Sequence, residues 1–201
     1  LRTAADRANV PFFEAAGEAA FYGPKLDFQM FDAAGREFTV STIQLDMLLP
    51  ERFRLSFTDT AGEPGTPVLI HRAPIGTLER FVAFLIEHFR GAFPLWLAPV
   101  HVRVLPVSRE THEYAQAVAD HLRGARLRIE VDESDETLQK KIRTSEVQKI
   151  PVMAVVGKQE ASAKTVTLRV RGGHSLGTKS LGETSELLAT HVARRSLTLP
   201  T

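Results

Sequence analysis

The sequence predicts an α+β arrangement in its first half and an α/β arrangement in its second half. Residues 26–73 contain several runs in which apolar and polar residues alternate, a pattern typical of antiparallel strands. Residues 77–89 then repeat apolar side chains at helical spacing. After a proline-bounded stretch at 93–99, short apolar runs alternate with amphipathic segments, which indicates a mainly parallel sheet covered by helices.

The first half is expected to form antiparallel hairpins. Residues 1–9 read as the end of a helix, and 26–31 and 37–45 alternate as two strands. Between them, DAAGR at 32–36 is a hairpin-turn signal, with Gly35 where a positive φ is needed. Further strands are expected at 52–57, where RFRLSF alternates, and at 67–73.

An amphipathic helix follows the strand PVLIHRA at 67–73. Pro74 and Gly76 end the strand, and Thr77 or Gly76 can cap the helix. Arg80 falls in the first turns, where a cation beside free backbone N–H groups suits an anionic or planar ligand such as a nucleotide. The alternative is a surface arginine paired with Glu79 or Glu87, and spacing alone favours that alternative. The apolar stripe and the terminating glycine are Phe81, Phe84, Leu85, His88, Phe89 and Gly91.

The second half reads as βαβαββα, with a domain boundary near residue 99. Strands are expected at 100–107, 127–131, 151–156 and 164–171, and helices at 110–123 and 135–149. In the helix over 135–149, we expect Leu138 and Ile142 to face inward and the basic residues, including Lys141, to face solvent. A last helix begins at a capping box, Ser180 with Glu183. The expected domains are 1–98 and 99–201.

Composition indicates a soluble globular protein. Of 201 residues, 43% are hydrophobic and 24% are charged, and no run approaches the roughly 18 apolar residues of a membrane span. The absence of cysteine excludes disulfides and thiolate metal sites and fits a cytoplasmic protein. Net charge is −3 over 1–98 (9 Lys and Arg, 12 Asp and Glu) and +4 over 99–201 (16 against 12). The basic half could contact a polyanion or present an ordinary solvated surface.

IHRA followed by GTLERF, at 70–73 and 76–81, resembles the third signature motif of class II aminoacyl-tRNA synthetases. Several other segments resemble the threonyl-tRNA synthetase family, and they occur in the same order along the whole chain. The resemblance implies the C-terminal half of an antiparallel class II catalytic domain, followed by an anticodon-binding α/β domain with a mixed sheet. Because the chain starts without methionine inside a helix, we expect it to be part of a longer protein. The other segments are FYGPKLDF (21–28), TIQLD (42–46), LPERF (49–53), FPLWLAPV (93–100) and KIRTSEVQKIPVMAVVG (141–157).

The resemblance implies that the intact enzyme activates threonine with ATP and Mg²⁺, and then transfers it to tRNA(Thr). It implies a cytoplasmic homodimer that does not bind DNA or membranes. The segments that resemble the first two signature motifs lie outside this chain, so we expect the chain alone to be inactive. By motif position, the catalytic residues would be Arg80, Tyr22, Lys25 and Gln44, and the ATP-binding residues Arg80, Gln44, Gly76 and Thr77.

His71 is implied as one of three protein ligands of a zinc ion that binds the substrate amino acid. Zinc with an open coordination position can bind both the amine and the hydroxyl of threonine, which valine cannot offer. The other two ligands would lie outside this chain, so His71 by itself is expected to be an unmetallated pocket histidine. The family has a bulky polar residue and a glycine where this chain has Thr39 and Ser41, beside the expected pocket.

The resemblance also implies a set of residues that contact the tRNA anticodon. Loop bases of single-stranded RNA would be read by hydrogen bonds and stacking, with basic side chains on the phosphates. Asp135 replaces the usual asparagine of the family, and Lys158 replaces an acidic residue. Each charge could equally belong to a solvated face. The implied contacts are Asp135, Glu136, Lys141, Arg143, Glu160, Arg169 and Arg171.

Two other functional classes fit the same residues. The chain could belong to an RNA-binding or regulatory relative that has kept the fold and lost amino-acid activation. It could also be a scaffold or dimerisation partner without a ligand of its own.

Overall fold

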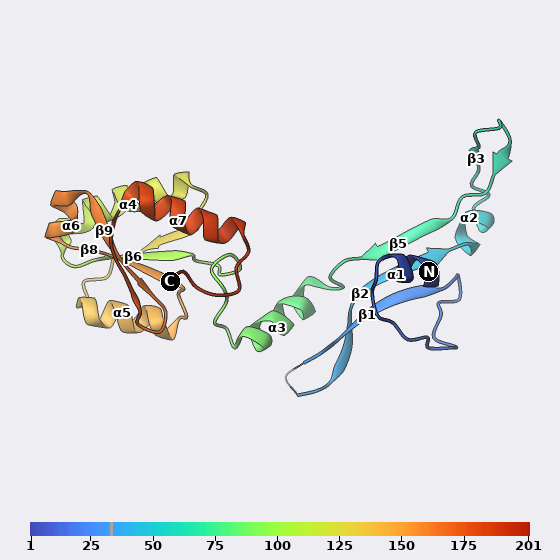
Figure 1. The fold of residues 1–201 in the computed structure, drawn as a ribbon, viewed down its shortest axis with the longest axis horizontal. Coiled ribbons are helices and arrows are strands. Elements are labelled where there is room, and N and C mark those ends of the chain that lie inside the picture. Colours follow the sequence, from blue (N-terminus) through green and yellow to red (C-terminus); the bar gives the residue numbers. More distant parts are fainter. Residues whose placement is uncertain (33) are drawn as a thin grey trace. The chain divides into compact units, whose positions relative to one another are not determined.

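The computed structural model describes residues 1–32 and 34–201, which divide into two compact units, 1–88 and 89–201 (Figure 1). The predicted turn at 32–36 includes Ala33, which lies outside the described residues. Gly35, in the same turn, has the expected positive φ, +77°.

The first unit is built on a three-stranded antiparallel sheet in the order β1-β2-β5, formed by β1 (Lys25–Phe31), β2 (Glu37–Asp46) and β5 (Leu69–Ala73). Its first two strands confirm the alternating pattern at 26–31 and 37–45. A β-bulge interrupts their register, because Phe28 pairs with Ser41 whereas Gln29 pairs with Thr39. Val40 is therefore an extra residue in β2, and it keeps Thr39 on the same face as the later polar residues of that strand.

Four shorter elements and one long helix complete this unit: α1 (Arg2–Arg7), α2 (Leu48–Arg52), β3 (Phe57–Thr58), β4 (Pro64–Gly65) and α3 (Leu78–Phe89). The predicted strand over 52–57 is wrong, since only its last residue is in a strand. Helix α2 forms just before it because Asp46 Oδ1 accepts the backbone N–H groups of Leu48 and Leu49. Pro50 is tolerated there because the first turn of a helix needs no N–H donor.

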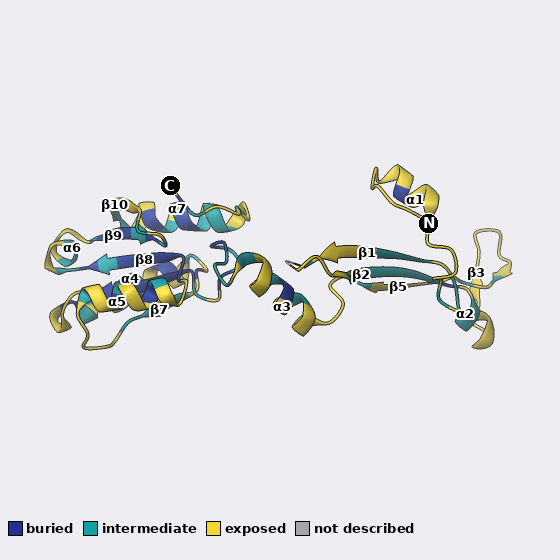
Figure 2. Ribbon diagram, turned by 90° about the horizontal axis from the view of Figure 1, so that it is seen from below, coloured by how far each residue is buried: buried dark blue, intermediate teal, exposed yellow. Residues whose placement is uncertain are grey.

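Hydrophobic burial is sparse in the first unit. Among its described residues, Ala5 and Phe84 are the buried hydrophobic side chains, and the Phe84 ring lies 5.3 Å from that of Phe38. Figure 2 shows strands β1, β2 and β5 mostly as intermediate or exposed. Apolar residues that face away from the polar residues of the sheet, such as Phe28 and Ile70, are 42% and 64% exposed. Strand pairing therefore dominates the structure of this unit.

The second unit contains a mixed sheet, as predicted, but the sheet has five strands where the sequence predicted four. Its order is β10-β9-β8-β6-β7, with β6 parallel to both neighbours and with antiparallel pairing from β8 to β9 and from β9 to β10. The strands are β6 (Val102–Pro106), β7 (Ile129–Val131), β8 (Val152–Val156), β9 (Thr165–Val170) and β10 (Ser175–Ser180).

Helices cover both faces of this sheet (Figure 1). Helix α4 (His112–Gly124), preceded by the 3₁₀ turn η1 (Arg109–Thr111), lies beside α7 (Leu181–Ala193) on one face, while α5 (Leu138–Val147) covers the other. Alternate strand residues, among them Val102, Val104 and Leu168, form an enclosed core with Leu122 of α4 and Leu188 of α7. The predicted capping box of Ser180 and Glu183 is present at the start of α7.

The predicted order βαβαββα lacks two elements that the structure contains, α6 (Lys158–Ala163) and β10. Helix α6 is only six residues long, and a bond from Gly157 N–H to the Glu160 carboxylate supports its start. Strand β10, SLGTKS, is a mostly exposed edge strand without apolar alternation. Neither element has a hydrophobic pattern from which it could be recognised.

Two arginines bind the backbone of residues 92–98, hereafter the connector. The Arg128 guanidinium donates to the carbonyl oxygens of Trp96 and Ala98 at 2.7–3.0 Å. Arg171 donates to those of Ala92 at 3.0 Å and Phe93 at 3.1 Å, and also to Lys149 O at 2.7 Å. These bonds hold both ends of the connector against the rest of the second unit.

Within residues 1–32 and 34–201, the longest apolar helices are too short or too polar to cross a membrane.

Candidate functional site

Polar side chains line one face of the sheet in the first unit. Lys25 pairs in register with Gln44, which pairs in turn with His71, so the three side chains form a row across β1, β2 and β5. Asp27 lies two residues after Lys25 on β1, and Asp46 lies two residues after Gln44 on β2. Both carboxylates are therefore on the same face of the sheet as this row. Three of the residues predicted for the active site, from segments far apart in the sequence, therefore share one surface.

Tyr22 precedes β1 and joins this row. Its hydroxyl donates to Gln44 Oε1 at 2.6 Å, and its ring lies 5.7 Å from the His71 ring in an edge-on arrangement. The next residue, Gly23, has φ of +156°, and a Cβ there would lie 2.0 Å from Leu45 O. Glycine is thus required for the close backbone approach that brings Tyr22 to β2.

Lys25 is held by a carboxylate on its own strand. Its Nζ lies 2.5 Å from Asp27 Oδ2, and this hydrogen bond is the main reason that the pKa of Lys25 is raised. Partial burial alone would raise the pKa of Asp27, but the hydrogen bond and the charge of Lys25 help to outweigh it, and that pKa is lowered. Both groups are therefore charged near neutral pH, and a substrate anion would compete with Asp27 for Lys25.

Arg80 borders a small hollow between the β2 bulge and the start of α3. Gly76, with φ of +59°, carries the chain from β5 into this turn. Within the described residues, Arg80 is not paired with Glu79 or Glu87, so the surface ion pair considered from the sequence is not formed. The hollow has a volume of about 30 Å³, and it is lined by Phe38, Thr39, Val40, Ile75, Gly76, Thr77, Arg80 and Phe81.

The two unusual residues of β2 lie on opposite faces. Thr39 lines the hollow beside Arg80, and its hydroxyl donates to Gln29 Oε1 at 2.9 Å. Ser41 pairs with Phe28 and so belongs to the apolar face of the sheet. Of the two, Thr39 therefore lies on the face of the polar row, where the pocket is expected, and Ser41 does not.

His71 is bonded to a buried carboxylate. Its Nε2 lies 2.9 Å from Asp46 Oδ2, and Asp46 is fully buried, whereas the His71 side chain is 43% exposed. Among the described residues, no three His, Asp or Glu side chains are grouped closely enough to hold a metal ion. The other ring nitrogen of His71 can supply one ligand, which fits a metal site completed by groups other than the described residues.

In the second unit, the loop that leads into α5 carries two of the predicted RNA contacts. Asp135 receives two bonds from the Arg109 guanidinium, one of them 2.8 Å from Nε to Oδ1, and this pairing holds the pKa of Asp135 below its usual value. Glu136 accepts from Lys140 at 2.6 Å. They border a cavity of about 280 Å³, which is lined by Val107, Ser108, Arg109, His112, Ser134, Asp135, Glu136 and Lys141.

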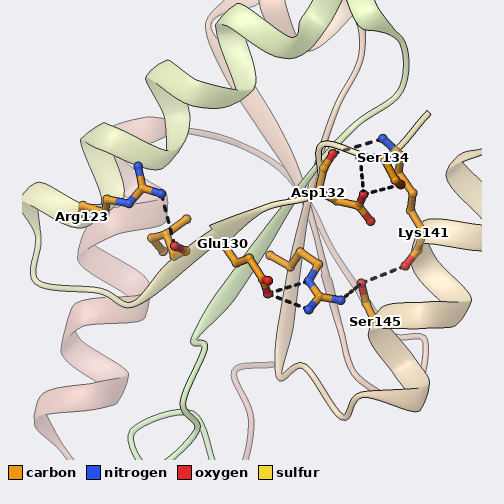
Figure 3. Close-up of polar contacts among 8 residues, drawn as sticks. Arg123, Glu130, Asp132, Ser134, Lys141 and Ser145 are labelled. Carbon is orange, nitrogen blue, oxygen red and sulfur yellow. Dashed lines mark hydrogen bonds and ion pairs between the residues drawn. The ribbon is translucent and has the colours of Figure 1, made fainter. Parts of the chain in front are cut away.

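Lys141 is buried, contrary to the expectation that it faces solvent. It is 3% exposed, and its Nζ donates to Pro106 O at 3.1 Å and Asp132 O at 3.3 Å. Figure 3 shows it beside Asp132 and Ser134, with Ser145 bonded to its backbone carbonyl. Lys141 therefore ties α5 to the ends of β6 and β7, at the floor of the cavity.

Glu160 lies in the first turn of α6, and Arg169 lies on β9. Glu160 Oε1 accepts from Thr167 Oγ1 and Oε2 accepts from Gly157 N–H, both at 2.9 Å. Burial alone would raise the pKa of Glu160, but these bonds lower it. Arg169 has a buried Nε without a hydrogen-bond partner in the described part of the chain. Both side chains retain unused bonding capacity.

The remaining two predicted contacts differ in their surroundings. Arg143 is exposed on α5, whereas Arg171 is half-buried and donates to the three carbonyl oxygens described above. The expectation that Arg169 and Arg171 share one strand face also needs correction, since β9 ends at Val170. Arg171 thus has a structural role that its position in the sequence did not suggest.

Replacing Arg171 by methionine is expected to destabilise the second unit by about 2–3 kcal/mol, because three carbonyl oxygens lose a charged donor. Urea unfolding followed by the fluorescence of Trp96, the only tryptophan, measures this change. The exposed Arg143→Met variant is the matched control and should unfold within about 0.5 kcal/mol of the parent. Equal stability of the two variants would show that Arg171 does not hold the connector.

Sequence reasoning missed two residues that organise these sites, Asp46 and Arg109. Asp46 ends the run TIQLD, and a carboxylate just before the helical segment LLPER is a capping signal. Arg109 lies 26 residues before its partner Asp135, and no local pattern links the two. Tertiary structure alone brings them together.

The two units correspond to two known domain models. Residues 5–89 match the tRNA synthetase class II core domain (G, H, P, S and T), and residues 101–191 match an anticodon binding domain. The prolyl-tRNA synthetase of Cryptosporidium parvum has the same fold, with a TM-score of 0.67 at 20% identity over 90% of this chain and 42% of that one. This combination of a core sheet and a mixed α/β domain defines a class II aminoacyl-tRNA synthetase.

More similar relatives specify the family. The chain is 48% identical over 98% of its length to a threonine–tRNA ligase of Prosthecochloris aestuarii, and 51% identical over 97% to that of Geobacillus kaustophilus. The RNA binding domain of threonyl-tRNA synthetase from Cryptosporidium parvum superposes with a TM-score of 0.84 at 36% identity, covering 94% of this chain and 48% of that one. The chain belongs to the threonyl-tRNA synthetase family and spans 30% of the length of these two curated relatives.

Proposed function

We propose that this chain is the portion of a threonine–tRNA ligase that carries part of the amino-acid and ATP site and the anticodon-reading domain. The complete ligase joins threonine to AMP with ATP and Mg²⁺, and then transfers the threonyl group to tRNA(Thr). It acts as a cytoplasmic homodimer. The two functional domains are residues 1–98 and 99–201, and the matched models, 5–89 and 101–191, lie on either side of that boundary.

The observation that carries the catalytic part of this proposal is the polar row on the first sheet. Tyr22, Gln44 and His71 lie within direct contact of one another, although they come from three separate segments. Such a row can bind the polar groups of a small substrate in a fixed orientation, which is a major source of rate acceleration in group transfer. Zn²⁺, when bound through His71, would supply a Lewis acid for the amine and hydroxyl of threonine.

Arg80, Gly76 and Thr77 support a nucleotide subsite at the other end of the same unit. Arg80 is exposed at the start of α3 and borders the hollow with both other residues. A planar guanidinium at that position can stack on a base or neutralise a phosphate. Gln44, which already accepts from Tyr22, would contact the adenylate from the middle strand.

The RNA-binding part of the proposal rests on the surface around α5 and β9. Arg143 offers an exposed cation, whereas Glu160 and Arg169 offer groups for base edges. Asp135 and Glu136 border the 280 Å³ cavity, which can admit part of a splayed base. Lys141 and Arg171 support this surface from below through backbone carbonyl bonds.

Binding of the 201-residue protein to tRNA tests the proposal. We expect tRNA(Thr) to bind more tightly than a non-cognate tRNA, and the ratio to persist as salt rises from about 50 to 300 mM, because base contacts are less salt-sensitive than phosphate contacts. Fluorescence anisotropy with end-labelled tRNA gives both affinities.

Arg143→Ala should weaken binding to both tRNAs, and Glu160→Gln should reduce the cognate preference. Arg72→Ala, on β5 of the first unit, serves as the control. Equal affinity for the two tRNAs that disappears with salt would refute anticodon reading by this domain.

A further inference from the structure

Asp46 is bonded in a way that leaves its carboxylate little freedom. Its Oδ1 accepts the N–H of Leu48 at 3.1 Å and the N–H of Leu49 at 2.9 Å, and the residue is fully buried. Because these two donors fix Oδ1, the other oxygen, Oδ2, is directed at His71 Nε2, 2.9 Å away. The carboxylate is thus oriented by the start of α2 and aimed at one nitrogen of one ring.

Asp46 determines which ring nitrogen of His71 carries the proton. An ionised carboxylate only accepts hydrogen bonds, so His71 Nε2 must carry a proton, and in the neutral ring Nδ1 then carries the lone pair. Tyr22 contacts the ring edge-on, but its hydroxyl donates to Gln44 Oε1. The position opposite His71 on β2 is Gln44.

We infer that Asp46 is a positioning residue that fixes His71 in the Nε2–H tautomer and thereby presents Nδ1 as the metal-binding nitrogen. The metal-binding part of this inference rests on the proposed function, in which His71 is a zinc ligand. The tautomer part depends only on the contacts of this chain. A carboxylate that accepts from the second nitrogen of a ligating histidine orients the ring and makes it a better donor to the metal.

Asp46→Asn tests this inference sharply. Leu48 and Leu49 N–H need an acceptor, so the amide oxygen of the new side chain must occupy the Oδ1 position. Its NH₂ group then faces His71 Nε2 and donates to it, which drives the proton to Nδ1 and removes the lone pair from that atom. The ring should remain in place while its tautomer is reversed.

The first measurement is long-range ¹H–¹⁵N correlation of the His71 ring in the 201-residue protein at about pH 8.5, where histidine is neutral. We expect the Nε2–H pattern in the parent and the Nδ1–H pattern in Asp46→Asn. Asp27→Asn, on the same sheet face but bonded to Lys25, is the control and should leave the ring unchanged. An Nδ1–H tautomer in the parent, or a variant that keeps Nε2–H, would overturn the inference.

The second measurement is zinc affinity by chelator competition in a ligase that contains this chain. Asp46→Asn is expected to weaken zinc binding about 10- to 100-fold, the usual effect of losing such a partner. A reversed tautomer with unchanged zinc affinity would show that Nδ1 is not the metal nitrogen. A ligase that binds no zinc at all would refute the proposed role of His71 while leaving the tautomer result intact.

Discussion

Replacing Arg80 by alanine in a ligase that contains this chain is expected to slow threonine-dependent ATP–pyrophosphate exchange at least about a hundredfold. Arg80 lies at the start of α3 beside Gly76 and Thr77, and no carboxylate among the described residues neutralises it. Its charge is therefore available to the phosphates or the base of ATP. The effect on stability should be small because the side chain is exposed.

Arg72 provides a matched control for this experiment. It lies eight residues before Arg80 in VLIHRAPIGTLERF, but it pairs with Ile43 and so projects from the opposite face of the sheet to His71. Arg72→Ala should leave the exchange rate within about twofold of the parent. The exchange rate of Arg80→Lys should lie between those of the parent and Arg80→Ala, since lysine keeps the charge and loses the planar stacking surface. Equal rates for Arg72→Ala and Arg80→Ala would argue against a nucleotide contact.

The second unit is expected to lose about 3 kcal/mol of stability between pH 7 and pH 4 through a single histidine. His101 is fully buried, and burial, reinforced by the Arg128 charge, lowers its pKa from 6.5 to about 4. Between these values the unfolded chain binds a proton that the folded chain does not bind. Stability therefore falls as the pH decreases below 6.5, and the loss is complete near pH 4.

His101→Asn isolates this contribution. His101 Nδ1 accepts from Arg128 N–H at 3.2 Å, and an asparagine oxygen can take the same position without titrating in this range. Urea unfolding followed by Trp96 fluorescence should show a shallower pH dependence for His101→Asn than for the parent. The exposed His121→Asn variant should keep the parental slope. If the free energy of unfolding depended on pH equally in all three proteins, His101 would not be the source of the loss.

The hydrophobic patterns of the sequence predicted the two sheets well, and they failed where polar contacts decide the structure. Alternation located β1 and β2, and helical spacing located α3. The segment 52–57 also alternates, but Asp46 caps a helix just before it, and only two residues pair as β3. The bonds from backbone N–H groups to Asp46 therefore favoured a helix where the alternating sequence favoured a strand.

Lys141 illustrates a conflict between spacing and chemistry. It follows Leu138 by three residues and so lies on the inward face of α5, where Ser145 is also buried. The prediction placed it in solvent because lysine is rarely buried. Burial is possible here because the carbonyl oxygens of Pro106 and Asp132 accept from its ammonium group.

The family resemblance identified the residues of the candidate site, whereas the register of the strands determines how they are arranged. No spacing rule relates Tyr22, Gln44 and His71, because three strands and a glycine turn bring them together. Asp46 was missed for the same reason, whereas Arg109 was missed because no local pattern links it to Asp135, 26 residues later. A register cannot be read from one sequence unless turn lengths and the paired faces are both known.

The mode of attachment of the connector bears on how its sequence can change during evolution. Arg128 and Arg171 bind carbonyl oxygens of residues 92–98, and every amino acid supplies that atom. Exchanges of the partly exposed connector side chains would therefore leave the anchors intact, whereas loss of either arginine would release several of them at once. Selection should accordingly act on two distant positions as well as on the buried connector residues Pro94, Leu95 and Ala98.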